Sequence, residues 1–120
     1  MDSILTSIKK LLGITEEQTN FDQDIIMHIN SVFSILTQLG VGPSEGFLIE
    51  DSSAIWSDFL EENTNLELVK TYVYMKVRLM FDPPLSSSVM DSINKIISEL
   101  EWRINVTVDP GKIKMEDKVS

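Results

Sequence analysis

Cysteine is absent from the 120-residue chain, so disulfide bonds and thiolate metal sites are excluded. No apolar run is long enough to cross a bilayer, so no contact with a membrane is expected. The first residues lack a basic region followed by an apolar one, so we expect no secretion signal. His28 is the single histidine, and no second imidazole is available to share a metal ion with it. The 42% of hydrophobic residues predicts one globular domain with a modest core.

Lysine and arginine are missing between Lys10 and Lys70, and the whole chain has a formal net charge of −9. Groove binding to nucleic acid needs clustered cations, which this half of the chain does not offer. The plainest interpretation is a solvated acidic face that keeps the protein soluble. Sharper interpretations are a surface that docks on a basic partner or one that repels DNA passing nearby. The carboxylates considered for such a surface are Glu45, Glu50, Asp51, Glu61 and Glu62.

Apolar residues recur at helical spacing in four long segments, which predicts an all-α fold, a small helical bundle. The third segment is apolar around the widest arc, so we predict that it forms the central and most buried helix. A shorter apolar segment between the second and the third predicts an additional short helix. The main helices are expected at about 2–12, 21–39, 65–81 and 87–106, and the short one at 54–60.

Capping residues and helix breakers set the expected ends of these helices. Asp2 or Ser3 can cap the first helix, and a glycine follows each of the first two. The consecutive prolines after Asp82 end the third helix, because proline cannot donate a backbone hydrogen bond. Ser88 with Asp91 is the plausible cap of the last helix.

Two segments are expected to be less regular than the helices. The connector at 41–53 contains several glycines and is predicted to be the most mobile internal loop, although 46–49 could form a short extended piece. Beyond the last helix, a proline and a glycine break the pattern, and the following residues are too polar to bury a core. We therefore divide the chain into a helical domain at 1–107 and a flexible C-terminal tail at 108–120.

Side chains with catalytic potential are present but are not arranged for catalysis. His28 falls beside the apolar stripe of its helix, where a structural role is more frequent than a catalytic one. Adjacent carboxylates such as Glu61 and Glu62 point apart on a helix. Residues 22–24 resemble the start of a calcium loop, but the required glycine and terminal glutamate are missing. We expect no enzymatic activity, no metal site and no cofactor.

The two tryptophans admit two interpretations. Trp56 and Trp102 are each more often part of a core, but aromatic side chains are also enriched at the centres of interfaces. Trp102 lies off the apolar stripe of the last helix, so we favour an interface role for it. The spacing of Lys95, Glu99 and Arg103 allows ion pairs along the exposed side. Trp102 and Arg103 are therefore our candidate residues for a contact between subunits.

Several stretches, taken in order, resemble a known family. Residues 72–84 read Tyr-Val-Tyr-Met-Lys-Val-Arg-Leu-Met-Phe-Asp-Pro-Pro, and residues 99–105 read Glu-Leu-Glu-Trp-Arg-Ile-Asn. They follow Ile-Asn-Ser at 29–31 and Leu-Gly-Val-Gly-Pro at 39–43. This series resembles the head–tail connector adaptors of long-tailed bacteriophages over about residues 1–108.

The resemblance implies a structural virion protein that forms a ring, usually of twelve copies, beneath the portal at the head–tail junction. Such a ring extends the channel through which the genomic DNA passes without specific binding, and it joins the capsid to a stopper or tail-joining protein. Assembly would take place in the bacterial cytoplasm. The resemblance also implies that the C-terminal segment becomes ordered against the portal. By position, the candidate docking residues are Lys112, Ile113, Lys114 and Met115.

A rival interpretation starts from the charge alone. An acidic DNA mimic or anti-host inhibitor would bind a basic nucleic-acid enzyme of the host. It predicts carboxylates spaced like phosphates on one face and a complex with a host protein in solution. The adaptor interpretation predicts instead that purified virions contain the chain. A generic regulatory helical domain is a third possibility, which no specific motif supports.

Overall fold

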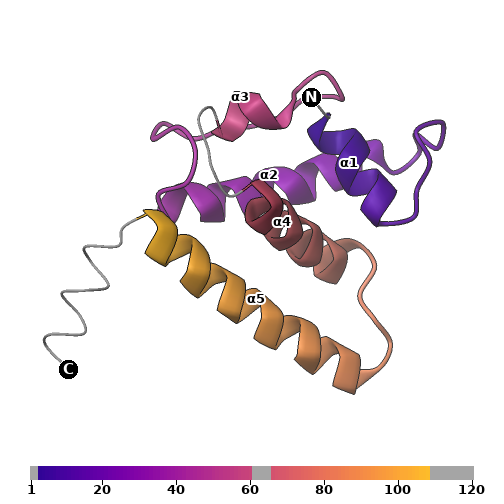
Figure 1. Cartoon of the computed structure of the whole chain (residues 1–120). Helices are drawn as coiled ribbons and strands as arrows, with labels where there is room; N and C mark the ends of the chain where they lie inside the picture. Colours follow the sequence, from indigo (N-terminus) through magenta and orange to yellow (C-terminus); the bar gives the residue numbers. More distant parts are fainter. Residues whose placement is uncertain (1–2, 61–65, 109–120) are drawn as a thin grey trace, which may run out of the picture.

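The computed structural model describes residues 3–60 and 66–108, and within them every regular element is a helix (Figure 1). Ser3 and Ile55 form an isolated antiparallel bridge, and residues 46–49 form no strand. The all-α prediction is confirmed, and the helix bounds fall within about two residues of those expected. The helices are α1 (Ile4–Leu11), α2 (Asp22–Gln38), α3 (Trp56–Leu60), α4 (Leu66–Phe81) and α5 (Ser87–Val108).

Helix α4 is the centre of the bundle, as its wide apolar arc predicts. It packs against α1, α2 and α5, whereas α2 and α5 make at most marginal contact with each other. Figure 1 shows α4 in the middle, with α1 and α3 on one side of it and α5 on the other. The α4 residues that pack into the core are Val69, Tyr72, Val73 and Val77.

The ends of α1 and α5 show how local sequence sets each helix. The Ser3 hydroxyl accepts a hydrogen bond of 3.2 Å from the Thr6 amide, which confirms a cap at the start of α1. At α5 the Ser86 hydroxyl accepts from the Val89 amide at 3.4 Å. Ser88 already lies inside the helix, so the predicted Ser88 cap is wrong. The helix begins at residue 87 as expected, but its cap is Ser86, two residues before the predicted one.

Candidate assembly surfaces

Helix α5 presents the first surface that the sequence analysis singled out. Trp102 has 59% of its surface exposed and lies outside the buried stripe, as expected from its position in the pattern. The exposed Arg103 guanidinium contacts the Glu99 carboxylate at 2.7 Å along the helix. An indole beside a charged pair suits a contact with another protein, because it offers apolar area and a polar N–H.

The α2–α3 connector is held at its middle by Asn30 of α2. The Asn30 side-chain amide donates to the Ile49 carbonyl at 3.0 Å, and its oxygen accepts from the Ile49 amide at 2.8 Å. Ile49 is buried, and Phe47 packs edge-on to Phe33 at 5.6 Å between ring centroids. The α2–α3 connector is thus anchored to α2. The prediction of a mobile loop did not foresee this anchor. Sequence reasoning missed Asn30, although it lies in a stretch that carries the family resemblance.

Gly42 lies where the α2–α3 connector comes close to the aromatic side chains of the core. Its φ of +79° lies in the region that other residues rarely adopt. A Cβ atom placed there would also lie 2.5 Å from Cε1 of Phe59. Phe59 in turn stacks on Phe33 with ring centroids 4.3 Å apart. A glycine at this position therefore lets the connector approach the aromatic part of the core.

The anchored connector carries part of the predicted acidic surface. Glu45, Glu50 and Asp51 are all exposed. The Ser53 hydroxyl and amide donate to the Asp51 carboxylate at 2.5 and 2.8 Å, and these hydrogen bonds hold the pKa of Asp51 below its usual value. This carboxylate therefore keeps its charge to a lower pH than a free aspartate. Glu61 and Glu62, the other two candidates, lie outside the described residues.

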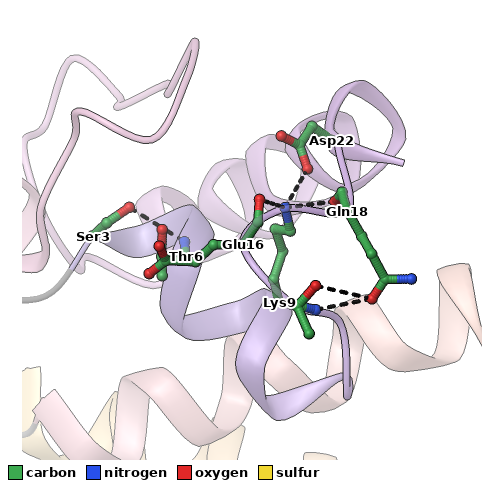
Figure 2. A network of polar contacts seen from close by, with 7 residues as sticks. Ser3, Thr6, Lys9, Glu16, Gln18 and Asp22 are labelled. Carbon is green, nitrogen blue, oxygen red and sulfur yellow. Dashed lines mark hydrogen bonds and ion pairs between the residues drawn. The ribbon is translucent and has the colours of Figure 1, made fainter. Parts of the chain in front are cut away.

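Lys9, in the last turn of α1, is buried and not a surface cation. Its side chain is 4% exposed, and the ammonium lies 2.8 Å from Oδ1 of Asp22. It also donates to the backbone carbonyls of Gln18 at 2.8 Å and Glu16 at 3.3 Å. Figure 2 shows these three oxygens converging on the one ammonium. Lys9 thus joins α1, the loop that follows it and the start of α2, so it belongs to the scaffold and not to a binding surface.

Two hollows open on the described surface. One of about 780 Å³ lies between α1 and α4, lined by hydroxyl side chains, Lys10 and Leu11 on one side and by Tyr74 and Met75 on the other. A second, of about 630 Å³, lies over α2 and the connector. Its rim includes Met27 and Leu48, whose side chains are 58% and 68% exposed. The second hollow is the more open of the two.

Two other kinds of site have no counterpart among the described residues. In residues 3–60 and 66–108, no group of three or more His, Asp or Glu side chains is placed to hold a metal ion. None of the described helices combines the length and apolar character needed to span a membrane. The predicted portal-docking residues Lys112, Ile113, Lys114 and Met115 lie outside the described part of the chain.

Comparison with protein families decides the class of this protein. A family model described as "Phage connector protein" matches residues 4–111, nearly the whole chain. The chain belongs to the phage connector protein family. Comparisons with curated proteins and with solved structures give no significant match. The resemblance seen in the sequence is therefore confirmed at the level of the family.

Membership in this family indicates a structural role at the head–tail connection of a phage particle. It places the connector protein among virion components, which act by contact with other virion proteins. The surfaces described above are the candidates for such contacts. The family match does not assign a role to any single residue, so Trp102, Arg103 and the acidic side chains remain predictions.

Proposed function

We propose that copies of this connector protein assemble into a ring of about twelve subunits beneath the portal. The ring extends the DNA channel and joins the capsid to a stopper or tail-joining protein. The family match over residues 4–111 carries this proposal. The all-α scaffold supports it, and two hollows on the described surface offer places where another protein can pack.

A ring built head to tail repeats one contact between two different faces of each subunit. Trp102 and Arg103 on α5 are our candidates for one face, because both are exposed and lie side by side in the sequence. The stretch from Glu45 to Asp51 in the α2–α3 connector is the candidate for the other face, because it is acidic and anchored by Asn30. The opposite charges of Arg103 and the connector favour this pairing.

The acidic residues have a second use in such a ring. DNA binds proteins largely through the release of cations from its phosphates, and a carboxylate surface offers no such gain. Glu45, Glu50 and Asp51, with Glu61 and Glu62, would let DNA slide past without adhering. The C-terminal tail would dock on the portal through Lys112 to Met115, where apolar and basic residues alternate.

Electron microscopy of the purified portal mixed with this protein tests the proposal. We expect a ring of extra density on the tail-facing end of the portal. Bare portals beside free monomers, together with infectious particles that lack the chain, would refute it. A stable complex with a host nucleic-acid enzyme, and no chain in purified virions, would favour the acidic inhibitor instead.

A further inference from the structure

The two hollows on the described surface differ in charge. The one between α1 and α4 carries both signs, since Lys10 and Lys70 line it together with Glu16 and Glu67. In the one over α2, Asp24 is the one charged residue among the described residues that line it. We call this second one the α2 hollow. A basic segment therefore gains from charge in the α2 hollow but not in the other.

The α2 hollow also exposes apolar side chains. Met27 and Leu48 both line it, and they are 58% and 68% exposed. Leu48 belongs to the α2–α3 connector, and the hydrogen bonds between Asn30 and Ile49 hold that stretch beside α2. Glu50, on the other side of the buried Ile49, is exposed as well. An occupant that suits this surface brings apolar side chains with lysines next to them.

The C-terminal tail contains a stretch with that composition. Residues 112–115 read Lys-Ile-Lys-Met, so two cations alternate with two apolar side chains. Over the whole tail at 108–120 the charges cancel, since three acidic residues balance three lysines. The acidic residues all lie outside 112–115, so this stretch by itself has a charge of +2. An extended backbone places Ile113 and Met115 on one side, where both can meet the same surface.

Helix α5 finishes at the same end of the bundle as α2. The hydrogen bond between Tyr72 and Glu101 places the second half of α5 beside the first half of α4. Phe21, just before α2, meets Phe81 at the end of α4 with ring centroids 5.4 Å apart. Helices α2 and α5 therefore both run opposite to α4 and end near its beginning, as Figure 1 also shows.

From that end the tail is long enough to reach the α2 hollow. Twelve residues follow Val108, and an extended chain advances about 3.4 Å per residue, so Ile113 can lie about 17 Å from the end of α5. Asn30, which lines the hollow, is about 12 Å from Gln38 along the axis of α2, at about 1.5 Å per residue. The two lengths are similar, so residues 112–115 can lie across the hollow of their own chain.

We propose that residues 112–115 of the free chain lie in the α2 hollow of the same chain. Their two apolar side chains cover the exposed apolar rim of the hollow, and their two lysines lie beside Asp24 and Glu50. The chain's own tail is favoured over the tail of a second copy, because a short tether gives it an effective concentration on the order of millimolar at the hollow.

This contact adds a step to the proposed function. Residues 112–115 cannot meet the portal and the α2 hollow at once, so docking on the portal draws the tail away and uncovers Met27 and Leu48. Before that point, the covered apolar surface keeps free chains from associating through it. The uncovering step rests on the proposed portal docking, whereas the contact in the free chain does not.

The absence of cysteine makes a cross-linking test direct. Ser31→Cys places a thiol in the hollow, and Glu116→Cys places one just after the docking stretch, so no proposed contact is removed. The purified chain, at low concentration, is treated with a short bismaleimide reagent and examined by mass spectrometry. We expect a cross-link within single chains. Lys10→Cys with Glu116→Cys is the matched control, because Lys10 lines the other hollow, and its yield should be roughly tenfold lower.

A further variant separates docking from chance encounters of a tethered tail. Ile113→Ser/Met115→Ser, added to Ser31→Cys/Glu116→Cys, should lower the yield to that of the Lys10 control. Equal yields at positions 31 and 10, or a yield that the two serines do not change, would overturn the inference. Cross-links between chains in place of those within one chain would show that a second copy's tail is the occupant, and would overturn it too.

Added portal distinguishes this inference from the proposed function. If both hold, an excess of purified portal should lower the yield within single chains roughly tenfold, because the tail is drawn to the portal. A cross-link that persists in portal-bound chains would overturn the docking of the tail on the portal and support its place in the hollow. A chain that never binds the portal would overturn the proposed function, while the cross-link in the free chain would still establish the contact.

Discussion

The Tyr72 hydroxyl of α4 donates a hydrogen bond of 2.7 Å to Oε2 of Glu101 on α5. Tyr72 is fully buried, and Glu101 is half-buried at the edge of the packed stripe. Burial raises the pKa of Tyr72 above its ordinary value, and the Glu101 carboxylate raises it further. Since α5 packs mainly against α4, this bond joins the two helices across their contact.

Replacing Tyr72 with phenylalanine should lower the free energy of unfolding by about 2 kcal/mol, because a hydrogen bond to a charged, partly buried group is lost. Urea denaturation followed by circular dichroism measures the change. Tyr74→Phe is the matched control: its hydroxyl accepts only a long contact of 3.4 Å from Arg78, and the loss should stay within about 0.5 kcal/mol. Equal losses of unfolding free energy in the two variants would show that the Tyr72–Glu101 hydrogen bond does not add to stability.

Alkaline pH should reduce the stability that Tyr72 contributes to the fold. A tyrosine in the unfolded chain loses its proton near pH 10, whereas the raised pKa keeps Tyr72 protonated in the folded chain. The unfolded state therefore binds fewer protons above about pH 10, and stability falls as the pH rises. The Tyr72→Phe variant lacks this dependence on pH. The difference in the free energy of unfolding between the variant and the wild type should therefore narrow from pH 8 to 11. A constant gap in urea titrations over that range would contradict the prediction.

Sequence reasoning found what depends on pattern and missed what depends on contacts between distant segments. The helices follow from apolar spacing, and the exposure of Trp102 follows from its place off the stripe. The burial of Lys9 was not predicted, because only the folded loop brings three oxygens around its ammonium. Asn30 holds a backbone group 19 residues away, and no local signal marks such a clamp. Gly42 was visible as a turn residue, but its contact with Phe59 was not.

Lys9→Met should lower the free energy of unfolding by about 3 kcal/mol, because it leaves Asp22 and two carbonyl groups without their cation. Lys10→Met, on the exposed side of the same helix, should change it by less than about 0.5 kcal/mol. In the double variant Lys9→Met/Asp22→Asn, the loss should be smaller than the sum of the two single losses. Strict additivity in chemical denaturation would mean that the two side chains do not act as a pair.

Asn30→Ala should release the connector from α2. Two hydrogen bonds to the buried backbone of Ile49 disappear, and we expect a loss of about 2–3 kcal/mol in the free energy of unfolding. Amide hydrogen exchange at Ile49 should accelerate more than exchange in α4. Ser31→Ala is the neighbouring control, since its hydroxyl bonds only to the Met27 carbonyl within α2. If the Ile49 amide exchanged no faster in Asn30→Ala than in the wild type, the Asn30 hydrogen bonds would not hold the α2–α3 connector in place.

Neutralising the acidic surface should alter the passage of DNA and leave the fold intact. Since the three described carboxylates, Glu45, Glu50 and Asp51, are exposed, replacing them with their amides should cost little stability. If they line the channel, the loss of like charge lets DNA adhere, and ejection triggered in purified virions should slow or stop. The full variant adds the amides at Glu61 and Glu62.

Raised salt distinguishes this effect from a defect in assembly. Added salt weakens the attachment of DNA to protein, so ejection from the neutralised variant should recover as the ionic strength rises. Glu16→Gln/Glu17→Gln, two exposed carboxylates of the α1–α2 loop, is the matched charge control and should eject normally. Normal ejection by the five-residue variant would exclude the channel wall and leave docking or solubility as the reason for the acidic charge.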